Sequence, residues 1–275
     1  MIKLENTVTP SPEQWQATIC GARNPMNSWG KSDSQFWPGH MRIGENDLDL
    51  MKRLVKAGTD HSKFMRFLPV MVDITAPLYW WKEFDTYKIG TVANSCSTMH
   101  KIQAKRFERE DFSIEHVLNC DEHHWMCCMD NIISAMNVAR EKYLETKDKK
   151  YWRQMIQILP SSYNQKRTVM LNYAVLRNIY RARAGHKLDE WQQFREWIEI
   201  LPYSELITMD SSPKSNKDKI AELCEILKSD KLIREAFCGS VASALYEIPD
   251  GVDLSVQEIA ERITNRVVGD ENGSN

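Results

Sequence analysis

Arginine and asparagine side chains are concentrated, among apolar residues, in the segment Tyr151–Pro202. A guanidinium group donates hydrogen bonds in a planar fork of fixed geometry, which suits carboxylates and phosphates. This is more fixed hydrogen-bonding chemistry than a core helix needs, although helical arginines commonly extend along the surface with the charge in solvent. The polar residues that could bind a ligand here are Arg167, Asn172, Arg177, Asn178, Arg181 and Arg183.

Cysteine and histidine residues form a second cluster, over residues 120–128, that could bind a metal. Cys120, His123 or His124, and Cys127 have helical spacing and carry the nitrogen and sulfur ligands that zinc prefers. Few clusters of this kind are completed by a second, distant pair of ligands. We therefore predict no metal site, and instead a helix through this stretch with its cysteines packed inward as small apolar side chains.

The composition is typical of a soluble globular protein. The 275 residues are 42% hydrophobic and 27% charged, enough to bury a full core in one large domain or two smaller ones. The net charge of −2 gives no general attraction to nucleic acid or to an anionic membrane, so an anionic ligand would need a local basic pocket. No apolar run approaches the roughly 20 residues of a membrane span, and the N-terminus lacks a signal-peptide pattern. Seven cysteines, an odd and partly clustered set, fit reduced thiols, and we expect a cytoplasmic protein.

Hydrophobic spacing and turn residues divide the first part of the chain into alternating elements. Thr9 or Ser11 can cap a first helix, and Gly58 ends a second one. The stretch Arg23–Gly44 is rich in Gly, Ser, Asn, Trp and Pro, so we expect a long loop there. Pro69 favours an edge or interrupted strand over a central one, because proline has no amide hydrogen to donate. The expected elements are a strand over Ile2–Val8, a helix over Glu13–Ala22, a helix over Glu45–Ala57, a strand over Phe64–Ile74 and a helix over Pro77–Ile89.

Two Leu-Pro pairs, at 159–160 and 201–202, bracket a region in which apolar residues recur three and four positions apart. This spacing predicts a helical segment with one buried face. The residues on that face are Val169, Leu171, Tyr173, Leu176, Ile179 and Tyr180.

The composition changes after Pro202. Residues 208–217 have the content of a linker, and a helical pattern follows over 218–268. Its last helix superficially resembles a helix-turn-helix element, but the module is rich in Asp and Glu and lacks a basic recognition face. We predict a main domain over 1–207, a linker over 208–217, a packing or partner-binding helical module over 218–268 and a disordered tail over 269–275.

The order of these elements resembles that of the flavin-dependent thymidylate synthases, the ThyX family. The helix start Thr9-Pro10-Ser11-Pro12-Glu13 and the turn Gly58-Thr59-Asp60-His61-Ser62 have counterparts in that family. Residues 86–100, TYKIGTVANSCSTMH, take the place of its signature Arg-His-Arg-x-x-Ser-x-Asn-Glu-x-Ser-x-Arg-Tyr. Asn94 and Ser97 match the motif. Ser95, Met99 and His100 replace its Glu, Arg and Tyr, and Tyr87-Lys88-Ile89, or Thr86-Tyr87-Lys88 with one insertion, replaces Arg-His-Arg.

The second half of the chain resembles the family's other conserved region, in which Leu-Pro leads to a helix reading Asn-x-Arg-x-Leu-x-Asn-Phe-x-x-Leu-Arg. Leu159-Pro160, Asn172, Leu176, Asn178 and Arg183 fall into that spacing, and Glu190, Trp191, Gln192 and Gln193 follow. Two arginines of the family motif are replaced here. The one before Leu-Pro is Ile156, with Arg153 one helical turn before it, and the one in Asn-x-Arg is Ala174. The resemblance covers residues 1–207 and implies an α+β fold. We expect a ThyX-like core with a small mixed or antiparallel sheet and long helices, followed by a C-terminal all-helical appendage.

The resemblance also implies a chemistry. ThyX enzymes bind FAD between the subunits of a homotetramer, use NADPH, and pass a one-carbon unit from methylenetetrahydrofolate to a deoxyuridine monophosphate-type nucleotide. It implies flavin contacts from Ser62, Lys88, Asn94, Asn172 and Asn178, and substrate contacts from Ser97, Arg153, Arg181 and Arg183. His61 and His100 are candidate proton carriers, with a structural role as the alternative. Two functions stay open: a divergent flavin-dependent nucleotide methyltransferase, or a non-catalytic relative that binds a nucleotide or a protein partner.

Overall fold

The computed structural model describes residues 2–117 and 125–209, which lie in one compact unit, Met1–Met209. The predictions for residues 118–124 and for the linker, helical module and tail beyond residue 209 lie outside the described residues. Within the described ranges, no helix is both long enough and apolar enough to cross a membrane.

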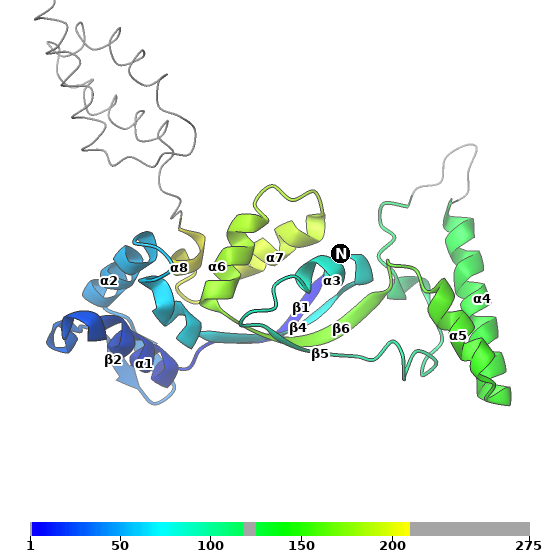
Figure 1. Ribbon diagram of the computed structural model, residues 1–275, viewed down its shortest axis with the longest axis horizontal. Helices are drawn as coiled ribbons and strands as arrows, with labels where there is room; N and C mark the ends of the chain where they lie inside the picture. The colour runs from blue at the N-terminus through cyan, green and yellow to red at the C-terminus, as the bar shows by residue number, and fades with distance from the viewer. Residues whose placement is uncertain (1, 118–124, 210–275) are drawn as a thin grey trace, which may run out of the picture. The chain divides into compact units, whose positions relative to one another are not determined.

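Four antiparallel strands form the central sheet, in the order β1-β4-β6-β5 (Figure 1). They are β1 (Lys3–Val8), β4 (Pro69–Pro77), β6 (Asn164–Asn172) and β5 (Val92–Ser95). β4 and β6 pair along their whole length, from Pro69 opposite Asn172 to Pro77 opposite Asn164. Helices and a small antiparallel sheet together confirm the expected α+β class.

The edge or interrupted strand predicted around Pro69 is wrong, because β4 runs without a break from Pro69 to Pro77 and lies between β1 and β6. Pro69 is the first residue of β4, where a missing amide hydrogen costs little. The preceding residues, Ser62–Phe67, form the 3₁₀ helix η3 in place of the predicted strand.

The single helical segment predicted around Val169 is also wrong. Val169 and Leu171 belong to β6, where they are buried and alternate with the exposed Thr168 and Met170, the period of two that a half-covered strand requires. Helix α6 (Tyr173–Ala182) begins only at the next residue after the strand. The Asn172 Oδ1 accepts a hydrogen bond from the Val175 amide at 3.0 Å and so caps α6 at its start.

Three helices cover one face of the sheet (Figure 1): α3 (Leu78–Phe84), α6 and α7 (Asp189–Glu199). Their aromatic side chains fill the core, with Trp80 and Trp191 ring centroids 4.7 Å apart. The helix predicted over Pro77–Ile89 ends earlier, at Phe84. A turn follows it, in which the Thr86 hydroxyl donates to the Glu83 carbonyl and Gly90 adopts a positive φ of 78°.

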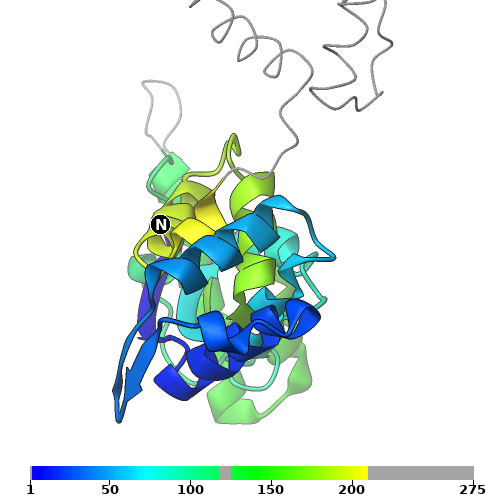
Figure 2. The ribbon, with the colours of Figure 1, turned by 90° about the vertical axis from the view of Figure 1, so that its left-hand side faces the viewer.

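Helices α1 (Pro12–Arg23) and α2 (Glu45–Lys56) pack near η3 and the short helix α8 (Glu205–Thr208). Of the two predicted caps, Thr9 and Ser11, it is Ser11 that caps α1, through a complete capping box with Gln14. The long loop predicted over 23–44 contains a hairpin of β2 (Gln35–Trp37) and β3 (His40–Arg42), which extends beyond α1 in Figure 2, and two short 3₁₀ helices, η1 (Asn24–Met26) and η2 (Trp29–Lys31).

A buried ion pair holds this segment in place. Arg23 Nε donates to the Asp47 carboxylate at 2.5 Å, and Arg23 also donates to the carbonyls of Ser28 and Lys31. Asp47 Oδ2 accepts from the hydroxyls of Ser32 and Ser34 as well. These hydrogen bonds tie residues 28–34 to Arg23 at the end of α1 and to Asp47 in α2.

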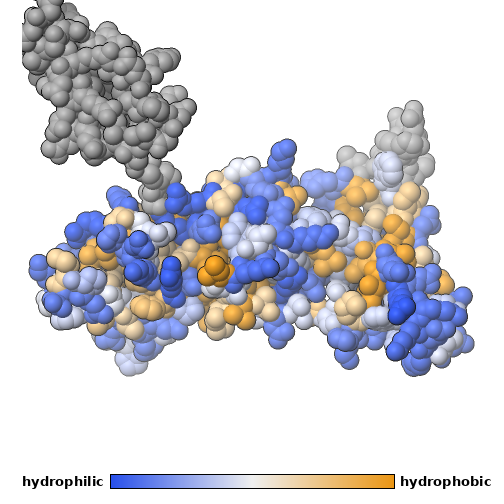
Figure 3. Space-filling view, in the orientation of Figure 1, coloured by the Kyte–Doolittle hydropathy of each residue, from blue (hydrophilic) through white to orange (hydrophobic). Residues whose placement is uncertain are grey.

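A second core lies under α4 (Trp125–Thr146) and α5 (Lys149–Ile158), with the 3₁₀ helix η4 (Arg109–Asp111) nearby, and apolar side chains gather toward this end of the molecule in Figure 3. The inward packing predicted for the cysteines is wrong for Cys127 and Cys128, both of which are exposed. Burial in α4 begins two turns after its start, where Ile133 and Met136 face the core.

Candidate functional site

The two segments with family-like motifs, 86–100 and 151–202, pack against each other at several points. β5 pairs with β6, so that Asn94 lies opposite Thr168. The Trp152 indole donates to the Met99 carbonyl at 2.7 Å. A Cβ added at Gly90 would lie 3.0 Å from the Asn172 side chain, so only glycine fits without displacement of its neighbours.

A further contact between the segments is a polar cluster on the helical side of the sheet, which we call the Glu83 cluster. It is made of Glu83, Tyr87, Arg183, His186 and Trp191. Glu83 lies in α3, Arg183 follows α6 and Trp191 lies in α7. The Glu83 Oε2 accepts from Arg183 Nη1 at 2.8 Å and from Trp191 Nε1 at 3.0 Å, and it lies 3.0 Å from His186 Nε2.

The hydrogen bonds assign the tautomer of His186. The Leu188 amide donates to His186 Nδ1 at 3.2 Å, so this nitrogen carries no proton. The proton of the neutral ring therefore lies on Nε2, which faces Glu83. All three groups around Glu83 Oε2 are donors.

Arg183 is held on several sides. Its Nε donates to the Tyr87 hydroxyl at 2.9 Å, its Nη1 binds Glu83, and its guanidinium carbon lies over the Trp191 ring at 4.5 Å. The side chain retains 17% exposure, and Nη2 has no hydrogen-bond partner among the described residues. The arrangement can present one fixed donor of a planar guanidinium to a ligand.

Asn94 lies on the opposite, uncovered face of the sheet, because its register partner Thr168 points there. Beside it, Asp73 accepts from Thr168 Oγ1 at 2.6 Å and from Asn6 Nδ2 at 2.9 Å, and pairs with Lys166 at 2.9 Å. These interactions, the Thr168 hydrogen bond first, lower the pKa of Asp73 well below its usual value. Within one chain, Asn94 and Arg183 therefore belong to different faces.

The other predicted site residues do not converge on one place in the described chain. His61 and Ser62 lie at the start of η3, and Asn178 and Arg181 are exposed on α6. Lys88 is exposed after α3, and Arg153 is exposed on α5.

Two predicted site residues have structural roles in the fold. The Ser97 hydroxyl accepts from the amides of Met99 and His100, so it stabilises a turn. Asn172 serves as the cap of α6.

Glu83 and His186 were not among the residues singled out from the sequence. Neither belongs to a short motif, and Glu83 binds a residue 100 positions away. One signal was present in the sequence. Arg183 and Trp191 are separated only by the connection between two helices, and a cation and an aromatic ring that close can stack on each other.

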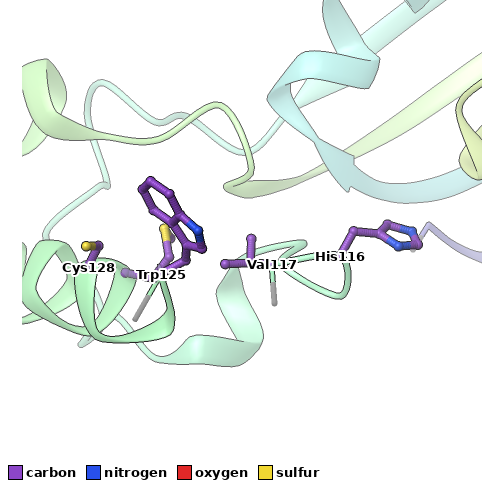
Figure 4. A pocket seen from close by; sticks show the side chains of 5 residues that line it. His116, Val117, Trp125 and Cys128 are labelled. Atoms are coloured by element: carbon purple, nitrogen blue, oxygen red, sulfur yellow. The ribbon is translucent and has the colours of Figure 1, made fainter. Parts of the chain in front are cut away.

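A shallow pocket of about 360 Å³ lies beside the start of α4, lined by His116, Val117, Trp125, Cys128 and Met129 (Figure 4). The His116 ring points away from the Trp125 ring in this view and lies 3.5 Å from the Asp189 carboxylate. The pocket wall is mainly apolar. Among the described residues, no three His, Cys, Asp or Glu side chains are grouped as metal ligands would be.

The sequence matches no protein-family model and no curated protein. Solved structures are similar, however. Thymidylate synthase X (ThyX) from Helicobacter pylori with FAD and dUMP matches with a TM-score of 0.54 and 18% identity, over 76% of this chain and 96% of that chain. The chain has a ThyX-like fold.

A second structure of the Helicobacter pylori flavin-dependent thymidylate synthase ThyX, complexed with FAD and dUMP, matches with a TM-score of 0.53 and 17% identity. It covers 76% of this chain and 97% of that chain. The ThyX-like fold expected from the order of elements is thus confirmed. Identity at this level shows the fold and leaves the chemistry to the residues of this chain.

Proposed function

We propose that this ThyX-like protein binds a deoxyuridine monophosphate-type nucleotide and is a divergent flavin-dependent thymidylate synthase homologue. The observation that carries the proposal is the Glu83 cluster, which joins the two family-like segments and holds Arg183 by its Nε and Nη1, leaving Nη2 without a hydrogen-bond partner among the described residues. ThyX structures with FAD and dUMP share the fold, which supports a nucleotide ligand.

The charge balance at Arg183 favours the base of a nucleotide over its phosphate. Glu83 already neutralises the guanidinium at 2.8 Å. A pyrimidine carbonyl is neutral, so it can accept a hydrogen bond from Arg183 Nη2 without being repelled by the Glu83 carboxylate. Lys88 and Arg181, both exposed, and Arg153 are the proposed phosphate contacts.

The residues present fit a flavin in part. Asn94 and Asn178 are exposed amides that can donate and accept, as the polar edge of a flavin ring requires, and Ser62 and Lys88 add a hydroxyl and a cation. Asn172 fits less well, because its Oδ1 is engaged in capping α6. Bound FAD would supply the redox chemistry, with NADPH and methylenetetrahydrofolate as cosubstrates, while the protein binds and orients.

One observation favours the second function, a non-catalytic nucleotide-binding or protein-interaction protein. The position of the family's Arg-His-Arg holds Tyr87, Lys88 and Ile89. The Tyr87 hydroxyl is bound to Arg183, and Ile89 is 93% exposed. This segment therefore offers one cation, Lys88, where the family motif has two arginines and a histidine.

We also propose a homo-oligomer, a tetramer by resemblance, in which copies meet through the uncovered face of the sheet. A row of apolar side chains crosses all four strands there, with each neighbouring pair in register. All four are exposed in the single chain, and burial against another copy would remove them from water. They are Val8, Met71, Met170 and Val92.

Spectroscopy and calorimetry test the two functions. The enzyme hypothesis expects purified protein to show flavin absorbance, or to acquire it with added FAD, and to bind dUMP. The Arg183→Lys variant should then bind dUMP about tenfold more weakly, because an ammonium cannot keep the fork geometry.

Arg167→Lys is the matched control, because Arg167 also stacks on a tryptophan, Trp81, and pairs with an acid, Asp85. It should bind dUMP as the wild type does. Protein that takes up neither FAD nor dUMP would remove the enzyme hypothesis. Binding of dUMP without FAD would favour the non-catalytic function.

A further inference from the structure

The carboxylate of Glu83 is the negative charge that lies next to Arg183. Its Oε2 is surrounded by Arg183 Nη1, Trp191 Nε1 and His186 Nε2 at 2.8, 3.0 and 3.0 Å. A guanidinium, an indole N–H and an imidazole N–H are donors suited to a phosphate or carboxylate oxygen. We call these three side chains the donor cradle.

The donor cradle is held by contacts that do not involve Glu83. The Trp191 side chain is fully buried, and Arg183 stacks on it and donates to Tyr87. The Leu188 amide orients the His186 ring, and the Gln192 side chain donates to the His186 carbonyl at 3.2 Å. The three donors should therefore keep their positions when the Glu83 charge is removed.

We infer that Glu83 is a specificity-determining residue that excludes anions from the donor cradle, so that a nucleotide presents its neutral base there and its phosphate elsewhere. This rests on the proposed function, in which a nucleotide approaches Arg183. A phosphate that approached Arg183 would meet the Glu83 carboxylate, and like charges at an interface are strongly unfavourable. A pyrimidine carbonyl carries no such charge.

The test is the affinity for inorganic phosphate, measured by calorimetry on the full chain. In Glu83→Gln the side-chain shape is kept but the negative charge is lost, so the Arg183 charge is no longer neutralised and phosphate binding at Arg183 should tighten at least about tenfold over the wild type. Asp85→Asn is the matched control. It removes the same charge from the end of the same helix, beside Arg167, which lies over Trp81 at 4.1 Å. Asp85→Asn should bind phosphate as the wild type does.

A second measurement uses the wild-type protein and holds even where Glu83→Gln fails to fold. The indole N–H resonance of Trp191, assigned by its loss in Trp191→Phe, should stay unmoved during a titration with phosphate. It should move during a titration with deoxyuridine, which has the base without the phosphate.

The outcomes separate the inference from the function on which it rests. Movement of the Trp191 resonance with phosphate in the wild type overturns the inference, as does a folded Glu83→Gln that binds phosphate no more tightly. If deoxyuridine moves nothing while Glu83→Gln gains phosphate affinity, exclusion by Glu83 is supported and the proposed nucleotide function fails.

Discussion

Arg183 and Trp191 lie in contact across the connection between α6 and α7, with the guanidinium carbon 4.5 Å from the centre of the indole ring. The same indole donates its Nε1 hydrogen to Glu83, the counter-ion of Arg183. One side chain thus positions both the cation and the anion of the Glu83 cluster. A cation over an aromatic face adds about 0.5–2 kcal/mol, depending on how far it is desolvated.

Trp191→Phe should keep the aromatic face and lose the hydrogen bond to Glu83. We expect a decrease of about 1.5–3 kcal/mol in the free energy of unfolding, since the hydrogen bond that is lost has a charged, half-buried acceptor, Glu83. Urea denaturation measures it. Trp29→Phe is the control, because the exposed Trp29 indole donates to a neutral amide, that of Asn24. Equal losses in the two variants would contradict the role of Glu83 as acceptor.

Asp47→Asn should destabilise the fold strongly. It removes the charge that faces Arg23 at 2.5 Å, and both side chains are buried. Removal of one partner of a buried pair costs about 3–5 kcal/mol, because the other charge stays buried without compensation. Asp49→Asn breaks the exposed pair with Arg53 and should cost at most about 0.5 kcal/mol. Similar denaturation midpoints for the two variants would refute this prediction.

Stability should fall on acidification through the Asp47 carboxylate. Burial raises its pKa, but hydrogen bonds from Ser34, Ser32 and Arg23 outweigh this effect and lower the pKa below the ordinary value. A carboxylate whose pKa is lower in the folded state than in the unfolded state stabilises the fold. This stabilisation is fully present at pH values above the unfolded-state pKa of about 3.9, and it is lost as the pH falls through the folded-state pKa. Asp73, also with a lowered pKa, acts in the same direction.

This pH dependence can be measured as the unfolding free energy between pH 6 and pH 2. The Asp47→Asn variant should lose less stability than the wild type on acidification, because the titrating group is gone. Parallel curves for the two proteins would show that Asp47 contributes nothing to the acid sensitivity.

Arg177→Met should loosen α8. Arg177 is buried, and its Nη1 donates to the carbonyls of Leu206, Ile207 and Met209 at the C-terminal end of that helix. Methionine keeps an apolar stem but no donor, so we expect a loss of about 2 kcal/mol and faster amide exchange over residues 204–209. Arg53→Met, on the exposed surface of α2, is the control. Unchanged exchange in α8 would contradict the capping role.

Met170→Glu should reduce self-association if copies meet through the uncovered sheet face. A charge in the row of Val8, Met71, Met170 and Val92 would have to be buried on assembly, which is unfavourable. Sedimentation velocity should show the wild type as an oligomer and the variant at lower mass. Met26→Glu, exposed and outside the sheet, should assemble like the wild type. A monomeric wild type would end the proposal.

The local signals in the sequence were sufficient for several elements. The strand that ends at Val8, a helix cap at Thr9 or Ser11, and the helix that ends before Gly58 were all predicted from residues a few positions apart. Caps and turns depend on hydrogen bonds within three or four residues, so the sequence carries them directly. The order of these elements was also enough to predict a ThyX-like fold.

Tertiary structure alone decided the rest. The apolar spacing around Val169 and Leu171 fitted a helix as well as a strand, and only pairing with β4 and β5 selected β6. Pairing on both sides also made β4 central in spite of Pro69. Arg183 was predicted as a site residue, but its partner Glu83 lies 100 positions away. A carboxylate and a guanidinium that distant in sequence meet only when helices pack on one sheet, so no local pattern could have shown that Arg183 is already paired.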